Sequence, residues 1–225
     1  MERFLTARIR CYYEIEEPRS TRAGRRWPLL IALHGFQGNK DSMMRLARHV
    51  ADGRMVVASL QAPYHFWFKT GRGTWDIQPG FGWGTNYKPE ESVALHHRNI
   101  LKLIERAVKE NHADPSRVFL LGFSQACSFN YRFVFSHPHK VRGVIAVCGG
   151  VPQDWNENRR YQPSQTHVLH IAASNDEWYS PEKNLEFRRQ LAERAASLDF
   201  RTYKTTHRFP RAAIPHIRQW IANHL

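Results

Sequence analysis

The chain has 225 residues, of which 42% are hydrophobic and 24% charged, with a formal net charge of +13. This composition is typical of a soluble globular protein, and we expect one domain, residues 1–225, with a sizeable core. No apolar run is long enough for stable membrane insertion. The chain opens like a strand and not like a signal peptide, and its three cysteines lack metal-ligand spacing, so we predict a cytoplasmic protein with reduced thiols.

The positive charge could attract nucleic acid or anionic lipid. The arginines are scattered, however, and only residues 19–26 form a local cluster, which we expect to be a solvated loop. We therefore predict no nucleic-acid partner. Thirteen histidines invite a metal site, but neither the pair His96-His97 nor His137-Pro138-His139 has the fixed helical spacing of metal ligands. We predict no metal and no other cofactor.

Apolar strands alternate with amphipathic helices, which indicates a mostly parallel sheet with helices on both faces. Strands are expected at residues 6–15, 29–33, 55–60, 118–121, 141–147, 166–171 and 200–204. Helices are expected at residues 41–51, 89–112, 125–136, 181–197 and 212–223.

Residues 61–88 interrupt this alternation, because they show neither a strand nor a helix period. The segment is rich in glycine and aromatic residues, and a loop this long in a compact domain is usually functional. We expect Trp67, Trp75 and Trp83, with Trp178 and Tyr179 further along the chain, to form an aromatic wall beside a site at the carboxyl edge of the sheet. A satellite core beneath a long loop is the alternative.

The strand at 118–121 runs into Gly122-Phe123-Ser124-Gln125-Ala126 and then a helix. This is the layout of a nucleophile elbow, in which a strained turn presents one serine. Ala126 differs by one methyl group from the glycine usual at its position. An ordinary strand-turn-helix with a buried serine is the alternative.

An elbow serine needs a histidine as its base and a carboxylate that orients the imidazole, in the chain order serine, acid, histidine. Asp176 and His207 each follow an expected strand, at the edge where open α/β sheets place their sites. We favour Asp176 over Glu177 because it comes first after the strand and has the shorter arm. We favour His207 over His216, which lies in the terminal amphipathic helix.

The segments His34-Gly35-Phe36, Gly122-Phe123-Ser124-Gln125 and Asn175-Asp176, with His207, resemble the serine carboxylesterases of the phospholipase/carboxylesterase group in the α/β-hydrolase superfamily. Acyl-protein thioesterases belong to that group, and dienelactone hydrolases are related to it. The resemblance covers residues 29–225 and implies a three-layer α/β-hydrolase fold. It also implies that the backbone N–H groups of Phe36 and Gln125 form the oxyanion hole, while His34 is expected to orient its loop.

These observations predict a serine esterase whose substrate is a small-molecule ester with a small or medium acyl group. Ser124 would attack the carbonyl, His207 would act as general base and then acid, and Asp176 would orient the imidazole. A thioesterase or peptidase with the same triad remains an alternative, as does a catalytically silent hydrolase-like binding protein. The sequence leaves open whether the chain forms a homodimer.

Overall fold

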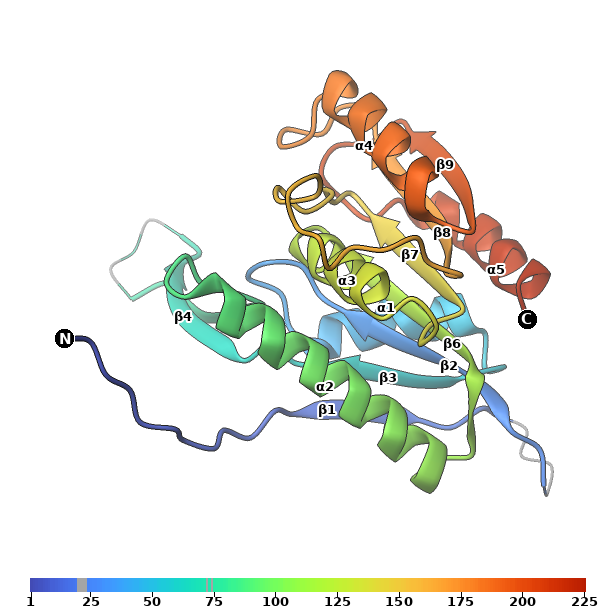
Figure 1. Ribbon diagram of the computed structural model, residues 1–225, viewed down its shortest axis with the longest axis horizontal. Helices are drawn as coiled ribbons and strands as arrows, with labels where there is room; N and C mark the ends of the chain where they lie inside the picture. The colour runs from blue at the N-terminus through green and yellow to red at the C-terminus, as the bar shows by residue number, and fades with distance from the viewer. Residues whose placement is uncertain (20–23, 72, 74) are drawn as a thin grey trace.

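The computed structural model describes residues 1–19, 24–71, 73 and 75–225, which fold around a seven-stranded sheet (Figure 1). The strand order is β1-β3-β2-β6-β7-β8-β9, with β1 antiparallel to β3 and every other pair parallel. The strands are β1 (Tyr13–Glu16), β2 (Trp27–Leu33), β3 (Val56–Leu60), β6 (Ala113–Phe123), β7 (Gly143–Val147), β8 (His167–Ala173) and β9 (Ser197–Tyr203). The predicted mostly parallel sheet is confirmed.

Helices cover both faces of the sheet, as predicted; in Figure 1, α2 and α3 lie in front of it and α1 lies behind. The helices are α1 (Lys40–Ala51), α2 (Pro89–Glu110), α3 (Gln125–Ser136), α4 (Pro181–Arg194) and α5 (Ile214–Asn223). Strand β2 shows why two layers form, because successive side chains of a strand point to opposite faces. Leu29 and Ile31 pack in the core that includes α2 and α3, whereas Leu30 and Ala32 pack in the core that includes α1 and α5.

The strand expected at residues 6–15 is wrong for most of its length, because β1 covers only Tyr13–Glu16. Strand β3 ends at Leu60, which pairs with Tyr13, so residues before Tyr13 have no neighbouring strand. Leu5 and Ile9 are 97% and 59% exposed. The apolar alternation there is therefore not the mark of a buried face, and residues 1–12 extend away from the sheet (Figure 1).

Residues 61–88 also differ from expectation, because they contain a hairpin of β4 (Tyr64–Lys69) and β5 (Ile77–Gly82). Along β4, half-buried side chains alternate with exposed ones, which is the two-residue period of a strand. The sequence does not show this period because aromatic residues occupy both faces. Glycine in β5 makes room for these rings. A Cβ atom at Gly80 would lie 2.9 Å from the Phe68 ring and 3.1 Å from the Phe66 ring.

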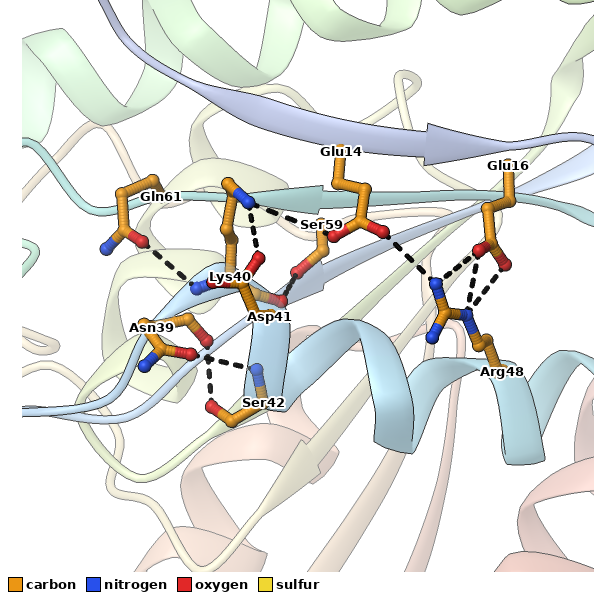
Figure 2. Close-up of polar contacts among 9 residues, drawn as sticks. All are labelled: Glu14, Glu16, Asn39, Lys40, Asp41, Ser42, Arg48, Ser59 and Gln61. Atoms are coloured by element: carbon orange, nitrogen blue, oxygen red, sulfur yellow. Dashed lines mark hydrogen bonds and ion pairs between the residues drawn. The ribbon is translucent and has the colours of Figure 1, made fainter.

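Helix α1 is fixed to the sheet by polar contacts at its start (Figure 2). The Asn39 side chain caps the helix by accepting the Ser42 N–H at 2.8 Å. The Lys40 N–H donates to Gln61 Oε1 at 3.1 Å, and the Ser59 hydroxyl donates to the Lys40 carbonyl at 2.8 Å. These contacts hold the residues after β2 and the residues after β3 together at the carboxyl edge of the sheet.

The other end of Figure 2 shows the edge strand β1 joined to α1 by charge. Arg48 Nε donates to Glu16 Oε1 at 2.8 Å, and Arg48 Nη2 lies 3.1 Å from Glu14 Oε1. Exposed ion pairs such as these contribute roughly 0–1 kcal/mol to the free energy of unfolding. They set the position of β1 more than the stability of the domain.

Candidate active site

Ser124 lies in the sharp turn between β6 and α3, with φ 54° and ψ −119°. Positive φ is costly for a residue with a side chain and is typical of a strained functional turn. The Ser124 N–H donates to the Val147 carbonyl at 2.9 Å, which anchors the turn to β7. A Cβ atom at Gly122 would lie 2.8 Å from Asn130 Nδ2, so this position needs glycine. Ala126 is fully buried in the same turn, and its extra methyl group is accommodated.

A chain of hydrogen bonds joins the three residues predicted from the sequence. His207 Nε2 lies 2.8 Å from Ser124 Oγ, and His207 Nδ1 lies 2.9 Å from Asp176 Oδ2. The Asp176 side chain is 1% exposed and that of His207 is 16% exposed. With its proton on Nδ1, the imidazole can accept the serine proton at Nε2, which is the arrangement that activates a serine nucleophile.

Asp176 and Glu177 both contact His207, but in different ways. Asp176 accepts from the His207 ring and also from the Trp178 N–H at 2.9 Å, so its carboxylate is held toward the imidazole. Glu177 Oε2 accepts the backbone N–H of His207 at 3.0 Å. Backbone N–H donors, its own and that of His207, lower the pKa of Glu177. Glu177 therefore positions the histidine loop, whereas Asp176 contacts the ring.

The loop after β2 is organised by His34, which is buried. Its Nε2 accepts the Ala62 N–H at 3.1 Å, so the ring proton is on Nδ1, which donates to the Gly35 carbonyl at 2.7 Å. Gln61 Nε2 lies 3.0 Å from the same His34 nitrogen. Burial lowers the pKa of His34 to about 4, so the ring is neutral at pH 7. The structure thus gives His34 the orienting role expected from the sequence.

The same loop touches the turn that carries Ser124. A Cβ atom at Gly35 would lie 2.8 Å from the Phe123 ring and 3.2 Å from Ser124 Cβ, so only glycine fits there. The expected oxyanion donors are the backbone N–H groups of Phe36, which follows Gly35, and of Gln125, which follows Ser124. Within the described part of the chain, neither N–H has a backbone acceptor outside the regular helices and strands.

The β4–β5 hairpin and Trp83, the residue after it, hold the segments that carry both expected donors, which the sequence did not indicate. The Gln37 N–H donates to the Phe81 carbonyl at 3.0 Å, next to Phe36. The Trp83 N–H donates to Gln125 Oε1 at 3.0 Å, and the Trp83 indole N–H donates to the His34 carbonyl at 2.7 Å. One residue, Trp83, therefore connects the loop after β2 with the start of α3.

The expected role of Trp83 in an aromatic wall is wrong, because its side chain is completely buried. Phe66 of β4 stacks on the Phe36 ring with 4.7 Å between centroids, and Trp67 points to the opposite face of the hairpin. Trp75 lies in the turn between β4 and β5 and is 87% exposed. A substrate contact by Trp67 or Trp75 stays a prediction.

Trp178, in contrast, lies beside the hydrogen-bonded chain. Its ring is 6.4 Å from the His207 ring between centroids and is 71% exposed. The Tyr179 ring, expected beside Asp176 together with Trp178, lies 6.1 Å from that of His207. Sequence reasoning missed Phe123, whose ring lies 5.4 Å from that of His207. Phe123 directly precedes Ser124, and this proximity is the signal that could have found it.

A cavity of about 590 Å³ opens beside these residues. Its lining includes Gln125 at the start of α3, Tyr179, and Gly150 from the loop after β7. A Cβ atom at Gly150 would lie 2.9 Å from the Tyr179 ring, so the two loops are in close contact. The cavity therefore adjoins the turn that carries Ser124, whose neighbour Gln125 lines it.

Two cysteines lie near Ser124 in the sequence or the fold, and both thiols are protonated at neutral pH. Cys127 and Cys148 are buried and neither forms a disulfide. Burial raises the pKa of the Cys127 thiol, and burial together with the negative charge of Asp176 raises the pKa of Cys148 to about 12. Both thiols stay protonated at neutral pH, and a protonated thiol is a poor nucleophile.

The described residues contain no group of three or more histidine, cysteine, aspartate or glutamate side chains arranged to hold a metal ion. None of the described helices is both long enough and apolar enough to cross a membrane. In the arginine cluster expected to be a solvated loop, Arg19, Arg25 and Arg26 are exposed. Residues 20–23, which include the fourth arginine, lie outside the described residues.

The chain resembles, at the level of fold, a carboxylesterase from Bacillus cereus at 16% identity and TM-score 0.73, covering 96% of this chain and 95% of that one. A carboxylesterase from Mesorhizobium loti gives 19% identity and TM-score 0.70, covering 87% and 88%. Among curated proteins, the bifunctional acetylxylan esterase/xylanase XynS20E of Neocallimastix patriciarum is 28% identical over 156 residues, 67% of this chain. The match spans only 19% of that longer protein.

A family model described as phospholipase/carboxylesterase matches residues 13–225, nearly the whole chain. The match begins at the first residue of β1 and includes every strand of the central sheet. The chain therefore belongs to the phospholipase/carboxylesterase family and has the α/β-hydrolase fold.

Proposed function

We propose that this protein is a serine carboxylesterase that hydrolyses esters of small or medium acyl groups through an acyl-enzyme. One observation carries the proposal: His207 lies within hydrogen-bond distance of Ser124 Oγ on one side, at 2.8 Å, and of the buried Asp176 carboxylate on the other, at 2.9 Å. A nucleophile, a base and a group that orients the base are thus within contact distance before substrate arrives.

In the acylation step, Ser124 Oγ attacks the ester carbonyl while its proton passes to His207 Nε2. Asp176 stabilises the imidazolium that forms. The negative charge on the carbonyl oxygen is stabilised by the backbone N–H groups of Phe36 and Gln125, each worth about 3 kcal/mol in comparable sites. The imidazolium then donates its proton to the alcohol oxygen, which leaves. The ester bond is broken and the acyl group remains on Ser124.

In the deacylation step, His207 Nε2 takes a proton from a water molecule that attacks the acyl-enzyme. The second tetrahedral intermediate uses the same two backbone donors. Its collapse returns the proton from His207 to Ser124 Oγ and releases the carboxylic acid. A small or medium acyl group is supported by the size of the insertion after β3, a two-stranded hairpin and not a large lid.

Replacement of the nucleophile tests the proposal. Ser124→Ala should lower hydrolysis of p-nitrophenyl acetate by about 10⁴-fold or more, because members of such a triad act as a unit. A fluorophosphonate should label the unmodified protein at Ser124. Ser174→Ala is the matched control, because Ser174 is an exposed serine after β8 that contacts Asn175. Equal turnover by the Ser124 variant, or labelling at another residue, would refute the assignment.

A substrate panel separates the alternatives that use the same residues. Acetyl thioesters and short peptides would react by the same steps, so their rates should be measured beside a series of p-nitrophenyl esters of increasing chain length. The printed name of the curated relative makes an acetylated sugar a further substrate to include. A silent binding protein would turn over none of them. We also propose a cytoplasmic location, which the free thiols of all three cysteines support.

A further inference from the structure

A long groove runs from the nucleophile across α3. Its first part is the cavity of about 590 Å³ that Gln125 and Tyr179 line. Its second part, of about 970 Å³, extends to His97 on α2 and to Tyr161. The two parts share a set of lining residues, Gly84, Thr85, Asn86, Ser128, Phe129, Arg132 and Gln153. The two volumes therefore lie side by side along these residues, and one end of the groove lies beside the expected oxyanion donor Gln125.

Polar side chains without a protein partner line this groove. Within the described part of the chain, the side chains of Asn86, Gln153 and Lys183 form neither a hydrogen bond nor an ion pair with another residue, and all three are exposed. The side-chain amides of Asn86 and Gln153 can both donate and accept hydrogen bonds, and a hydroxyl group of a ligand can do the same. A purely apolar chain in this groove would remove these groups from water without a partner, which is unfavourable.

Half-buried aromatic rings lie among these polar groups. Phe129, Tyr179 and Phe187 all line the first part of the groove, and the last two pack edge to face with 5.7 Å between centroids. Rings of this kind offer flat apolar surfaces against which the C–H faces of another ring can pack. The groove thus combines apolar faces with hydrogen-bonding groups.

The charges of the groove balance one another. Arg132 donates to Asp154 at 2.5 Å and to the Tyr161 hydroxyl at 2.6 Å, so its charge is already paired. Lys183 and Glu186 on α4 carry opposite charges and line the same part. This balance does not favour an anionic ligand, although the whole chain carries a formal net charge of +13.

We infer that the groove binds the alcohol part of the ester, and that this part is a neutral chain of hydroxylated rings, an acylated oligosaccharide. The inference rests on the proposed esterase function and adds the substrate class. The acyl carbonyl would lie at Ser124, and successive sugar rings would extend past Tyr179 and Phe129 toward Tyr161. The amides of Gln153 and Asn86 would bind sugar hydroxyls at the part of the groove that both volumes share.

The decisive measurement is the dependence of kcat/KM on sugar chain length. The substrates are acetylated xylo-oligosaccharides of one to four units, with p-nitrophenyl acetate as the reference without a sugar. KM should fall by about tenfold or more from one unit to four, because each added ring gains contacts in the groove. In Gln153→Leu, the ratio of kcat/KM for the tetramer to that for p-nitrophenyl acetate should fall about tenfold.

Gln219→Leu is the matched control, because Gln219 is an exposed glutamine on α5, on the opposite face of the sheet. It should leave both rates unchanged. Ester turnover that depends on Ser124 but not on sugar chain length would overturn the oligosaccharide inference and leave the esterase function standing. A KM that falls instead with alkyl chain length, or with the length of an acylated peptide, would overturn it as well. If the unmodified protein hydrolysed none of these esters, the proposed function itself would be refuted.

Discussion

At the scale of single residues, two neighbouring carboxylates contact the same histidine, and their different contacts predict different roles. Asp176→Asn should lower kcat by about 10⁴-fold, because an amide cannot hold the Nδ1–H tautomer that leaves Nε2 free to accept the serine proton. Glu177→Gln should change kcat by less than about threefold, because the glutamine oxygen can still accept the His207 N–H that Glu177 now binds at 3.0 Å. Steady-state kinetics with p-nitrophenyl acetate distinguishes the two.

The pair serves as its own control, since the two positions are adjacent and both replacements convert a carboxylate to an amide. If the glutamine variant were the inactive one, Glu177 would be the orienting acid and the contacts at Asp176 would be structural. Circular dichroism of both variants shows whether the fold is retained.

The residues of this hydrogen-bonded chain could be predicted from the sequence for a definite reason. Ser124, Asp176 and His207 each follow a strand of one parallel sheet, and such strands end at one edge. The contacts around them could not be predicted in the same way. Trp83 lies 49 positions from His34, and its indole N–H bond to that residue depends on how the hairpin folds back.

At the scale of elements, the hairpin was missed because hydrophobic alternation is the signal for a strand, and β4 has aromatic residues on both of its faces. The predicted N-terminal strand is too long for the opposite reason. Its alternation is present at residues 5–11, but a strand also needs a neighbour, and β3 ends at Leu60. Pairing is a property of the folded sheet and cannot be read from a local pattern.

The hairpin has a predicted function, which is to hold the two expected oxyanion donors in place. Trp83→Phe removes the indole N–H, leaves the buried His34 carbonyl without this donor and keeps most of the apolar contact. We expect kcat to fall on the order of tenfold with little change in KM, because the donors act on the transition state more than on bound substrate. Steady-state kinetics gives both parameters.

Trp67→Phe makes the same chemical change on the exposed face of the hairpin, away from the His34 carbonyl. It should leave kcat unaltered, and the predicted substrate contact of Trp67 would appear in KM. If Trp83→Phe raised KM while kcat stayed constant, the hairpin would bind substrate and would not position the donors. The apparent Tm of each variant separates a local effect from partial unfolding.

At the scale of the whole molecule, buried histidines couple stability to pH. Burial lowers the pKa of His34 and His97 to about 4 and that of His170 to about 3. For His97 the neighbouring His137 lowers the pKa further. In the unfolded chain these residues have a pKa of about 6.5. Below pH 6.5 the unfolded chain therefore binds protons that the folded protein does not bind.

The free energy of unfolding should consequently fall as the pH falls from 6.5 toward 4, and it should be insensitive to these groups above pH 7. Each such histidine contributes a slope of up to about 1.4 kcal/mol per pH unit. Urea unfolding at pH 7.5, 6.0 and 5.0 measures the slope. His97 packs against Phe133, so His97→Phe keeps an aromatic ring at this position. In this variant the slope should decrease by up to about 1.4 kcal/mol per pH unit, the contribution of one proton. His65→Phe changes an exposed histidine and should leave the slope unaltered, so equal slopes in all three proteins would show that the buried rings do not cause it.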